Sequence, residues 1–290
     1  MPIATALGYR LVTGYMVTKN NRKSEKNPDT GILYGAESYD TGPNDSSGAV
    51  LLIHGFIGAG NNFNDLPERL ASLGWHVRVM RLPGHGTSPS DLEKETADSM
   101  LRAVREELDN LRKTHDCLAV VGHSMGGTLG ILAAAETGVD RLVLCAPYFG
   151  ATRKWYYLLS PETWASVSYP VVRWVYKGRA FVQVNRKEAK NKIVSYRWVP
   201  TQGFRILMEL GKRADSPEIL NRVSCPVLLL HSRGDNAASW ECAEKAFDSI
   251  NSTGKRAVWL KTSNHHIFWD YEHDEVIEEI EKFLGRVEEK

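Results

Sequence analysis

The sequence carries almost no net charge and has few cysteines, and each shortage excludes a class of protein. Its 36 Lys and Arg residues nearly balance 35 Asp and Glu residues, so the formal net charge is +1. Proteins that bind nucleic acid usually present an excess of basic residues, which this chain lacks. The cysteines stand in or beside apolar runs without the paired spacing of a zinc site, which predicts buried, reduced thiols. We therefore expect no nucleic-acid partner, no metal or other cofactor, and a cytoplasmic location. The four cysteines are Cys117, Cys145, Cys225 and Cys242.

Long apolar runs are also missing, and no stretch is long enough to span a bilayer. The mildly apolar residues 1–17 lack the basic start of a secretory signal and carry Arg10 in their middle. We expect a helix or strand packed on the edge of the domain. The alternative is an amphipathic surface helix, with Leu7, Leu11 and Tyr15 at a spacing of four. The sequence thus predicts no stable membrane insertion, and the alternative leaves room for weak association with a lipid surface.

Short apolar runs bounded by turn residues alternate with helical patterns along most of the 290 residues. Such runs are typical of strands buried on both faces of a parallel sheet, with helices packed on either side. The predicted strands are residues 31–38, 49–53, 75–80, 117–121, 141–146, 226–231 and 256–261. The predicted helices are residues 66–73, 90–114, 126–135, 239–250 and 273–287, and residues 20–29 and 40–48 are predicted loops.

Residues 148–224 interrupt this alternation. They are dense in aromatic and basic side chains and show no clean strand pattern. We interpret them as an inserted helical cap, in which some aromatics form the cap's own core and others line an apolar pocket. The predicted organisation is an N-terminal extension (1–34), an α/β core (35–149 and 225–290) and a cap (150–224).

Ser124 stands at the apex of a Gly-x-Ser-x-Gly sequence, between a predicted strand and a predicted helix. Glycines allow the sharp turn that lifts a serine hydroxyl clear of a sheet. A serine becomes a nucleophile when a base accepts its proton and a carboxylate orients that base. The loops after the last two predicted strands offer Asp235 and His265 for these roles. His266 is the alternative base, and Asp270 and Asp274 are the alternative acids.

With these residues in place, the chain resembles the α/β-hydrolases, and specifically the microbial carboxylesterases related to monoacylglycerol lipases. The resemblance covers roughly residues 35–284, the cap least, and rests on five features in order. These are His54-Gly55-Phe56, the Arg-Leu-Pro-Gly-His-Gly of residues 81–86, the Gly-His-Ser-Met-Gly-Gly of residues 122–127, Asp235 and His265. The sequence departs from the family at Asn264, where glycine is usual, and at residues 236–238, where an apolar pair is more typical.

The resemblance implies a mechanism. Ser124 would attack an ester carbonyl, His265 would take its proton, and Asp235 would orient His265. Backbone N–H groups of Phe56 and Met125 would bind the oxyanion, and water would release the acyl group.

We therefore expect a hydrolase of small-molecule acyl esters of short to medium chain length, monoacylglycerols included. A thioesterase, an amidase or peptidase, and an acyltransferase would use the same residues, and a non-catalytic binding protein is a further alternative. We expect His54 and His85 to hold their own loops, and the side chain of His123 to point away from the serine. The sequence does not predict the oligomeric state.

Overall fold

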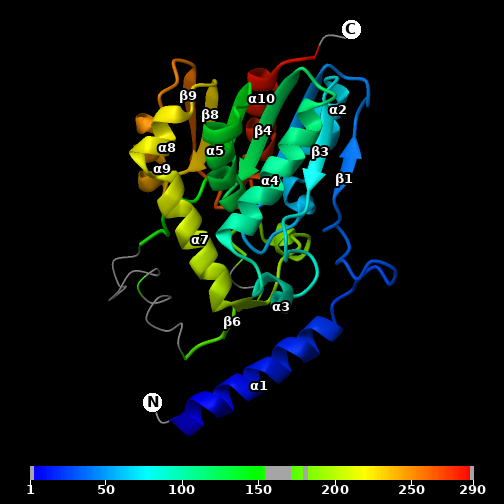
Figure 1. Ribbon diagram of the computed structural model, residues 1–290, viewed down its shortest axis with the longest axis vertical. Helices are drawn as coiled ribbons and strands as arrows, with labels where there is room; N and C mark the ends of the chain where they lie inside the picture. The colour runs from blue at the N-terminus through cyan, green and yellow to red at the C-terminus, as the bar shows by residue number, and fades with distance from the viewer. Residues whose placement is uncertain (1–2, 154–162, 164–170, 179–181, 288–290) are drawn as a thin grey trace.

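A seven-stranded, mostly parallel sheet forms the centre of the molecule in the computed structural model (Figure 1). The structure describes residues 3–153, 163, 171–178 and 182–287. The strand order is β1-β3-β2-β4-β5-β8-β9, and each neighbouring pair is parallel except β1 with β3. The strands are β1 (Tyr39–Thr41), β2 (Gly48–Ile53), β3 (His76–Met80), β4 (Cys117–His123), β5 (Arg141–Cys145), β8 (Val227–Ser232) and β9 (Lys255–Leu260).

Helices cover both faces of this sheet because its central strands are apolar on both sides. Val120 of β4 packs into the cluster on one face and Val121 into the cluster on the other, as the alternation of side chains along a strand requires. The first face carries α4 (Ala97–Arg112), α5 (Met125–Thr137), α8 (Pro217–Arg222) and α9 (Trp240–Ser249). The second face carries α2 (Leu66–Ser72) and α10 (His273–Leu284). The α/β-hydrolase architecture predicted from the sequence is therefore present.

The helix predicted over residues 90–114 is in fact two helices, α3 (Pro89–Leu92) and α4. The Thr96 hydroxyl accepts the amide of Ser99, while the Ser99 hydroxyl accepts the amide of Thr96. This reciprocal capping box starts a new helix at residue 97. The single-helix prediction was wrong because it followed the apolar spacing and overlooked the cap.

The first predicted strand was also misplaced. Residues 31–38 contain only an isolated bridge at Leu33, and the strand β1 follows at residues 39–41. Gly31 and Gly35 adopt positive φ angles of 68° and 80°, outside the range of a regular strand. Because β1 is a three-residue edge strand with exposed side chains, it lacks the apolar run that marks a buried strand, and residues 40–48 read as a turn.

The segment predicted as a cap contains both strands and helices. β6 (Trp174–Tyr176) and β7 (Trp198–Pro200) pair antiparallel as a small second sheet, which the sequence did not predict. A 3₁₀ helix (Lys187–Asn191) lies between these two strands in the sequence. The long helix α7 (Thr201–Ala214) begins directly after β7. Six of the predicted cap aromatics lie outside the described residues: Trp155, Tyr156, Tyr157, Trp164, Tyr169 and Phe181.

The N-terminal residues form a helix, α1 (Ile3–Arg22), which extends three residues into the predicted loop at 20–29. Figure 1 shows it lying across the end of the molecule beneath β6, far from the sheet. The Tyr9 hydroxyl donates to the Trp174 carbonyl at 2.6 Å, while Leu11 and Tyr15 are 68% and 66% exposed. No helix among the residues that the structure describes has the length and apolar character needed to cross a membrane.

The cysteines are all free, but they are less buried than the sequence predicted. Cys145 in β5 is fully buried, and burial raises the pKa of its thiol. Cys117 and Cys225 are partly buried, and Cys242 is exposed on α9. The prediction of four buried thiols was therefore correct only for Cys145. The apolar neighbours of Cys242 are on other faces of its amphipathic helix.

Candidate active site

Ser124 lies between β4 and α5 in a backbone conformation that serine rarely adopts. Its φ and ψ angles are 54° and −118°, the strained geometry of a nucleophile elbow. A Cβ atom on Gly126 would lie 1.8 Å from the carbonyl oxygen of Ile53, and one on Gly122 would lie 2.3 Å from the carbonyl oxygen of Gly126. Both positions therefore require glycine. The turn lifts Ser124 at the carboxyl end of the strands, where the loops after β2, β8 and β9 also meet.

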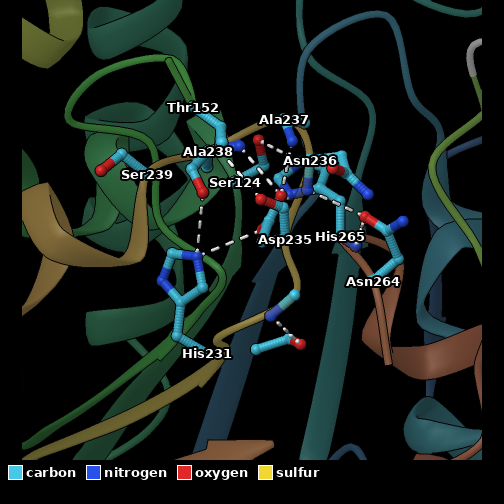
Figure 2. Close-up of polar contacts among 12 residues, drawn as sticks. Ser124, Thr152, His231, Asp235, Asn236, Ala237, Ala238, Ser239, Asn264 and His265 are labelled. Atoms are coloured by element: carbon cyan, nitrogen blue, oxygen red, sulfur yellow. Dashed lines mark hydrogen bonds and ion pairs between the residues drawn. The ribbon is translucent and has the colours of Figure 1, made fainter. Parts of the chain in front are cut away.

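The structure brings Ser124, His265 and Asp235 together in one line of hydrogen bonds (Figure 2). The Ser124 hydroxyl lies 2.9 Å from Nε2 of His265, and Nδ1 of His265 donates to Oδ2 of Asp235 at 2.7 Å. All three residues are buried. A neutral imidazole that donates from Nδ1 presents Nε2 as an acceptor, so it is ready to take the serine proton.

Asp235 accepts four hydrogen bonds, which fix its carboxylate in place. Oδ1 accepts the amides of Ala237 at 2.7 Å and Ala238 at 3.0 Å. Oδ2 is shared between His265 and a second histidine, His231, whose Nε2 lies 3.1 Å away. Burial alone would raise the pKa of Asp235, but the charge of His265 and the hydrogen bonds from His231 and His265 outweigh it and hold that pKa well below its usual range. Asp235 is therefore ionised and can stabilise an imidazolium.

His231 is a member of this network that the sequence analysis did not single out. It stands near the end of β8, fully buried, and stacks on the indole of Trp259. Its Nε2 faces both Asp235 and the carbonyl of Ala238, at 3.1 and 3.3 Å. The sequence signal that could have revealed this contact is the spacing of four between His231, near the end of a predicted strand, and the candidate acid Asp235. A turn between them brings the two side chains together.

Asn264, one of the two departures from the family pattern, connects three loops, and Figure 2 shows it beside His265 and Asn236. Its Oδ1 accepts the amide of His265 at 2.9 Å and the amide of Asn236 at 3.0 Å. Its Nδ2 donates to Oδ1 of Asn185 at 3.1 Å. Asn264 thus links the loop of the candidate base, the loop of the candidate acid and the cap segment, and glycine could form none of these bonds.

The two alternative acids lie elsewhere. Asp270 is fully buried, but it accepts backbone amides rather than an imidazole. Oδ1 accepts from Arg186 and Tyr271, and Oδ2 accepts from Asn185 and Asn264. It therefore fastens the cap segment to the loop that carries His265. Asp274 is exposed, and its carboxylate contacts only His273 among the described residues.

The two candidate oxyanion donors occupy the expected positions. Phe56 follows β2, and Met125 is the first residue of α5. Among the described residues, neither backbone amide has a hydrogen-bond acceptor. The amide of Met125 also lies at a helix N-terminus, where the aligned peptide dipoles favour negative charge.

The remaining histidines of the motifs have distinct roles. As predicted, His54 holds its own loops: Nδ1 donates to the carbonyl of Gly55 at 2.9 Å, and Nε2 accepts the amide of Leu82 at 3.1 Å. The ring of His123 forms no hydrogen bond with Ser124 among the described residues. Its Nε2 donates to the carbonyl of His265 at 2.9 Å. Burial, and then the nearby charge of His265, lower the pKa of His123 to about 3, so it stays neutral.

A cavity of about 420 Å³ opens above Ser124. Its apolar wall comes largely from the cap segment, and the predicted aromatics Tyr148, Tyr176 and Phe204 contribute to it. The polar residues of the lining include Lys177, Gln183 and His266. None of the described residues that line the cavity is an aspartate or a glutamate. The apolar lining also includes Phe56, Ile57, Val175, Leu207 and Met208.

Residues 44–272 match the family model described as serine aminopeptidase, S33. The chain belongs to this α/β-hydrolase family. The hydrolase is 30% identical over 264 residues to the thermostable monoacylglycerol lipase of Bacillus sp. (strain H-257), covering 88% of this chain and 96% of that protein. It is 22% identical over 243 residues to the carboxylesterase of Bacillus subtilis (strain 168), covering 83% and 93%. A solved structure of the metagenome-derived lipolytic enzymes LipS and LipT is similar at a TM-score of 0.77 and 25% identity, covering 87% of this chain and 98% of that one.

Proposed function

We propose that this hydrolase cleaves carboxylic esters of short to medium acyl chain, monoacylglycerols among them, through an acyl-enzyme on Ser124. The observation that carries the proposal is the hydrogen-bonded series Ser124–His265–Asp235 at the base of a largely apolar cavity. The lipase and carboxylesterase activities in the names of its relatives support the same substrate class.

In the proposed reaction, the Ser124 oxygen attacks the ester carbonyl as its proton passes to Nε2 of His265. The tetrahedral oxyanion accepts hydrogen bonds from the amides of Phe56 and Met125, a contribution worth roughly 10²–10³ in rate per donor. His265 then gives the proton to the leaving alcohol, while ionised Asp235 stabilises the imidazolium. Water, deprotonated by His265, hydrolyses the acyl-enzyme and restores the serine.

The cavity favours an ester over the substrate of an aminopeptidase, the activity that the family description names. An aminopeptidase must hold the cationic amino terminus of a peptide, and a carboxylate is the natural partner for that group. The described cavity lining carries no carboxylate and contains Lys177, whose charge has the opposite effect. The apolar residues of α7, including Phe204, Leu207 and Met208, suit an acyl chain instead.

Steady-state hydrolysis of p-nitrophenyl butyrate, p-nitrophenyl octanoate and 1-octanoylglycerol tests the proposal, with Ser124→Ala as the matched control. We expect release of acid from all three by the wild type, and none above background by the variant. Equal rates for the two proteins would refute it. An octanoyl thioester and an octanoyl amide of the same alcohol skeleton, run in parallel, separate an esterase from a thioesterase or amidase. Product analysis with added glycerol detects acyl transfer.

The cytoplasmic location also remains our proposal. Four free thiols are compatible with a reducing compartment.

A further inference from the structure

The cavity lining contains a lysine whose ammonium group has no partner among the described residues. Lys177 follows β6, and its backbone amide donates to the carbonyl of Arg197 at 2.7 Å, which fixes its position in the hairpin. Its side chain is partly buried and lines the cavity over Ser124. Among the described residues, no carboxylate forms an ion pair with its ammonium group, and no acceptor forms a hydrogen bond with it. Partial removal of a cation from water without a counter-charge is unfavourable, and an anionic ligand in the cavity would supply that counter-charge.

A second polar group lines the same cavity. His266 is part of the lining, and its buried Nδ1 has no hydrogen-bond partner in the part of the chain that the structure describes. Its backbone amide donates to the carbonyl of Gln183 at 3.0 Å, which fastens it to the cap segment. Burial, followed by the charges of His123, His265 and Lys177, lowers the pKa of His266 well below its usual range. His266 is therefore a neutral imidazole near the Lys177 ammonium, and it can donate a hydrogen bond.

His266 directly follows the candidate base His265 in the chain. The His265 and His266 rings lie 5.7 Å apart between centroids, in an edge-to-face arrangement. In the proposed reaction, His265 protonates the oxygen of the departing alcohol, so the alcohol must lie next to this imidazole. The apolar residues that α7 contributes to the lining suit the acyl chain.

From this arrangement we propose that Lys177 and His266 form a subsite for an anionic group, carboxylate or phosphate, on the alcohol moiety of the ester. The proposal rests on the ester hydrolysis proposed above and narrows its substrate class to esters of acidic alcohols. The ammonium gains a counter-charge, and the imidazole donates to the same anion. A neutral polyol such as glycerol would leave the lysine charge uncompensated.

A series of three octanoyl esters with the same three-carbon alcohol skeleton tests the subsite. In 1-octanoylglycerol the terminal group is a hydroxymethyl group, in 3-octanoylglycerate it is a carboxylate, and in 1-octanoylglycerol 3-phosphate it is a phosphate ester. We expect kcat/KM to be roughly tenfold to a hundredfold higher for at least one anionic ester, the range of a hydrogen bond to a charged group. The two anionic members distinguish the carboxylate from the phosphate source.

Two variants separate the charge of Lys177 from its volume. Lys177→Met keeps the length of the side chain and should remove the preference for the anionic ester, mainly by raising the KM of that ester, so that its kcat/KM falls to about that of the neutral ester. Lys177→Arg keeps the charge and should retain the preference. Thermal unfolding verifies that both variants are folded, and the comparison of substrates on the wild type tests the subsite even if a variant fails to fold.

The pH profile supplies an independent readout. Burial lowers the pKa of Lys177 to about 8. The ratio of kcat/KM for the anionic ester to that for the neutral ester should therefore fall as the pH rises through about 8 in the wild type, and stay constant in Lys177→Arg. The ratio cancels the titration of groups that act equally on both substrates. The other titratable groups lining the cavity are His123, Tyr148, Tyr176, His265 and His266.

These experiments distinguish failure of the anion subsite from failure of the proposed ester hydrolysis. If no ester is cleaved faster than by Ser124→Ala, ester hydrolysis itself is refuted. If 1-octanoylglycerol is cleaved but neither anionic ester is preferred, the subsite alone is refuted. An equal loss on all three esters in Lys177→Met would also overturn the subsite, because it would reveal a structural role. A monomethyl ester of octanedioic acid, which carries its carboxylate on the acyl side, should show no dependence on Lys177, and a dependence would refute the assignment to the alcohol.

Discussion

Removal of the Asn264 side chain should weaken both the fold and the site. The variant Asn264→Ala deletes the acceptor for the amides of His265 and Asn236 and the donor to Asn185. The amide of His265 is buried, so it would lose its only partner among the described residues without gaining water in exchange. The other two bonds are partly buried and can be replaced in part by solvent.

The size of the effect follows from these environments. An orphaned buried amide is worth about 1–3 kcal/mol, and a partly exposed hydrogen bond about 0.5–1.5 kcal/mol. We therefore expect Asn264→Ala to lower the free energy of unfolding by about 2–4 kcal/mol. Since the His265 backbone would no longer be fixed, the 2.9 Å approach of its Nε2 to the Ser124 hydroxyl would loosen. A misplacement of this kind reduces kcat by roughly tenfold to a hundredfold.

Urea unfolding and hydrolysis of p-nitrophenyl butyrate measure the two effects. Asn251→Ala is the matched control, because Asn251 is an exposed asparagine whose side chain makes one long hydrogen bond to the carbonyl of Asn221. That variant should change the free energy of unfolding by less than about 0.5 kcal/mol and leave kcat unchanged. An Asn264→Ala protein with the stability and kcat of the wild type would refute this reasoning.

Three further predictions concern the elbow, the acid and the buried histidines. Gly126→Ala places a Cβ against the Ile53 carbonyl, 1.8 Å away, and should abolish esterase activity and lower the melting temperature; a fully active variant would contradict this geometry. His231→Leu removes a donor to Asp235 and should reduce kcat roughly tenfold, with KM nearly unchanged, and an unaltered kcat would show that His231 has no positioning role. Burial lowers the pKa of His85 to about 4, so the unfolded chain binds a proton that the folded protein does not. The free energy of unfolding should therefore fall below about pH 6.5, by about 1.4 kcal/mol per pH unit for each such histidine, and urea titrations that give a constant value would contradict it.

The central strands of the sheet could be predicted because each is marked by a pattern in its own few residues. Each central strand is a short apolar run, and each predicted strand from β2 through β9 of the main sheet lies within two residues of the observed one at either end. The three-residue strands β1, β6 and β7 escaped prediction, since so few residues show no periodicity and their pairing depends on distant partners. The break between α3 and α4 was visible in principle, in the capping box at Thr96 and Ser99.

The residues of the candidate site that belong to sequence motifs could be predicted from the order of those motifs along the chain. Ser124, Asp235 and His265 follow three strands whose carboxyl ends meet, so chain order and topology suffice to bring them together. The bonds of Asn264 and the contact between His231 and Asp235 depend on side-chain directions within loops, which no spacing rule fixes. For the same reason the sequence could not place Lys177 at the cavity, where it was one of many basic residues of the cap segment.

The central claim is that Ser124 is a nucleophile activated by His265. Reaction with a fluorophosphonate probe, followed by peptide mass spectrometry, tests it most directly, because the probe forms a covalent bond only with an activated serine. We predict one label per protein molecule, located on Ser124, and its loss in His265→Ala. A label on another residue, or labelling of His265→Ala at the wild-type rate, would contradict the claim.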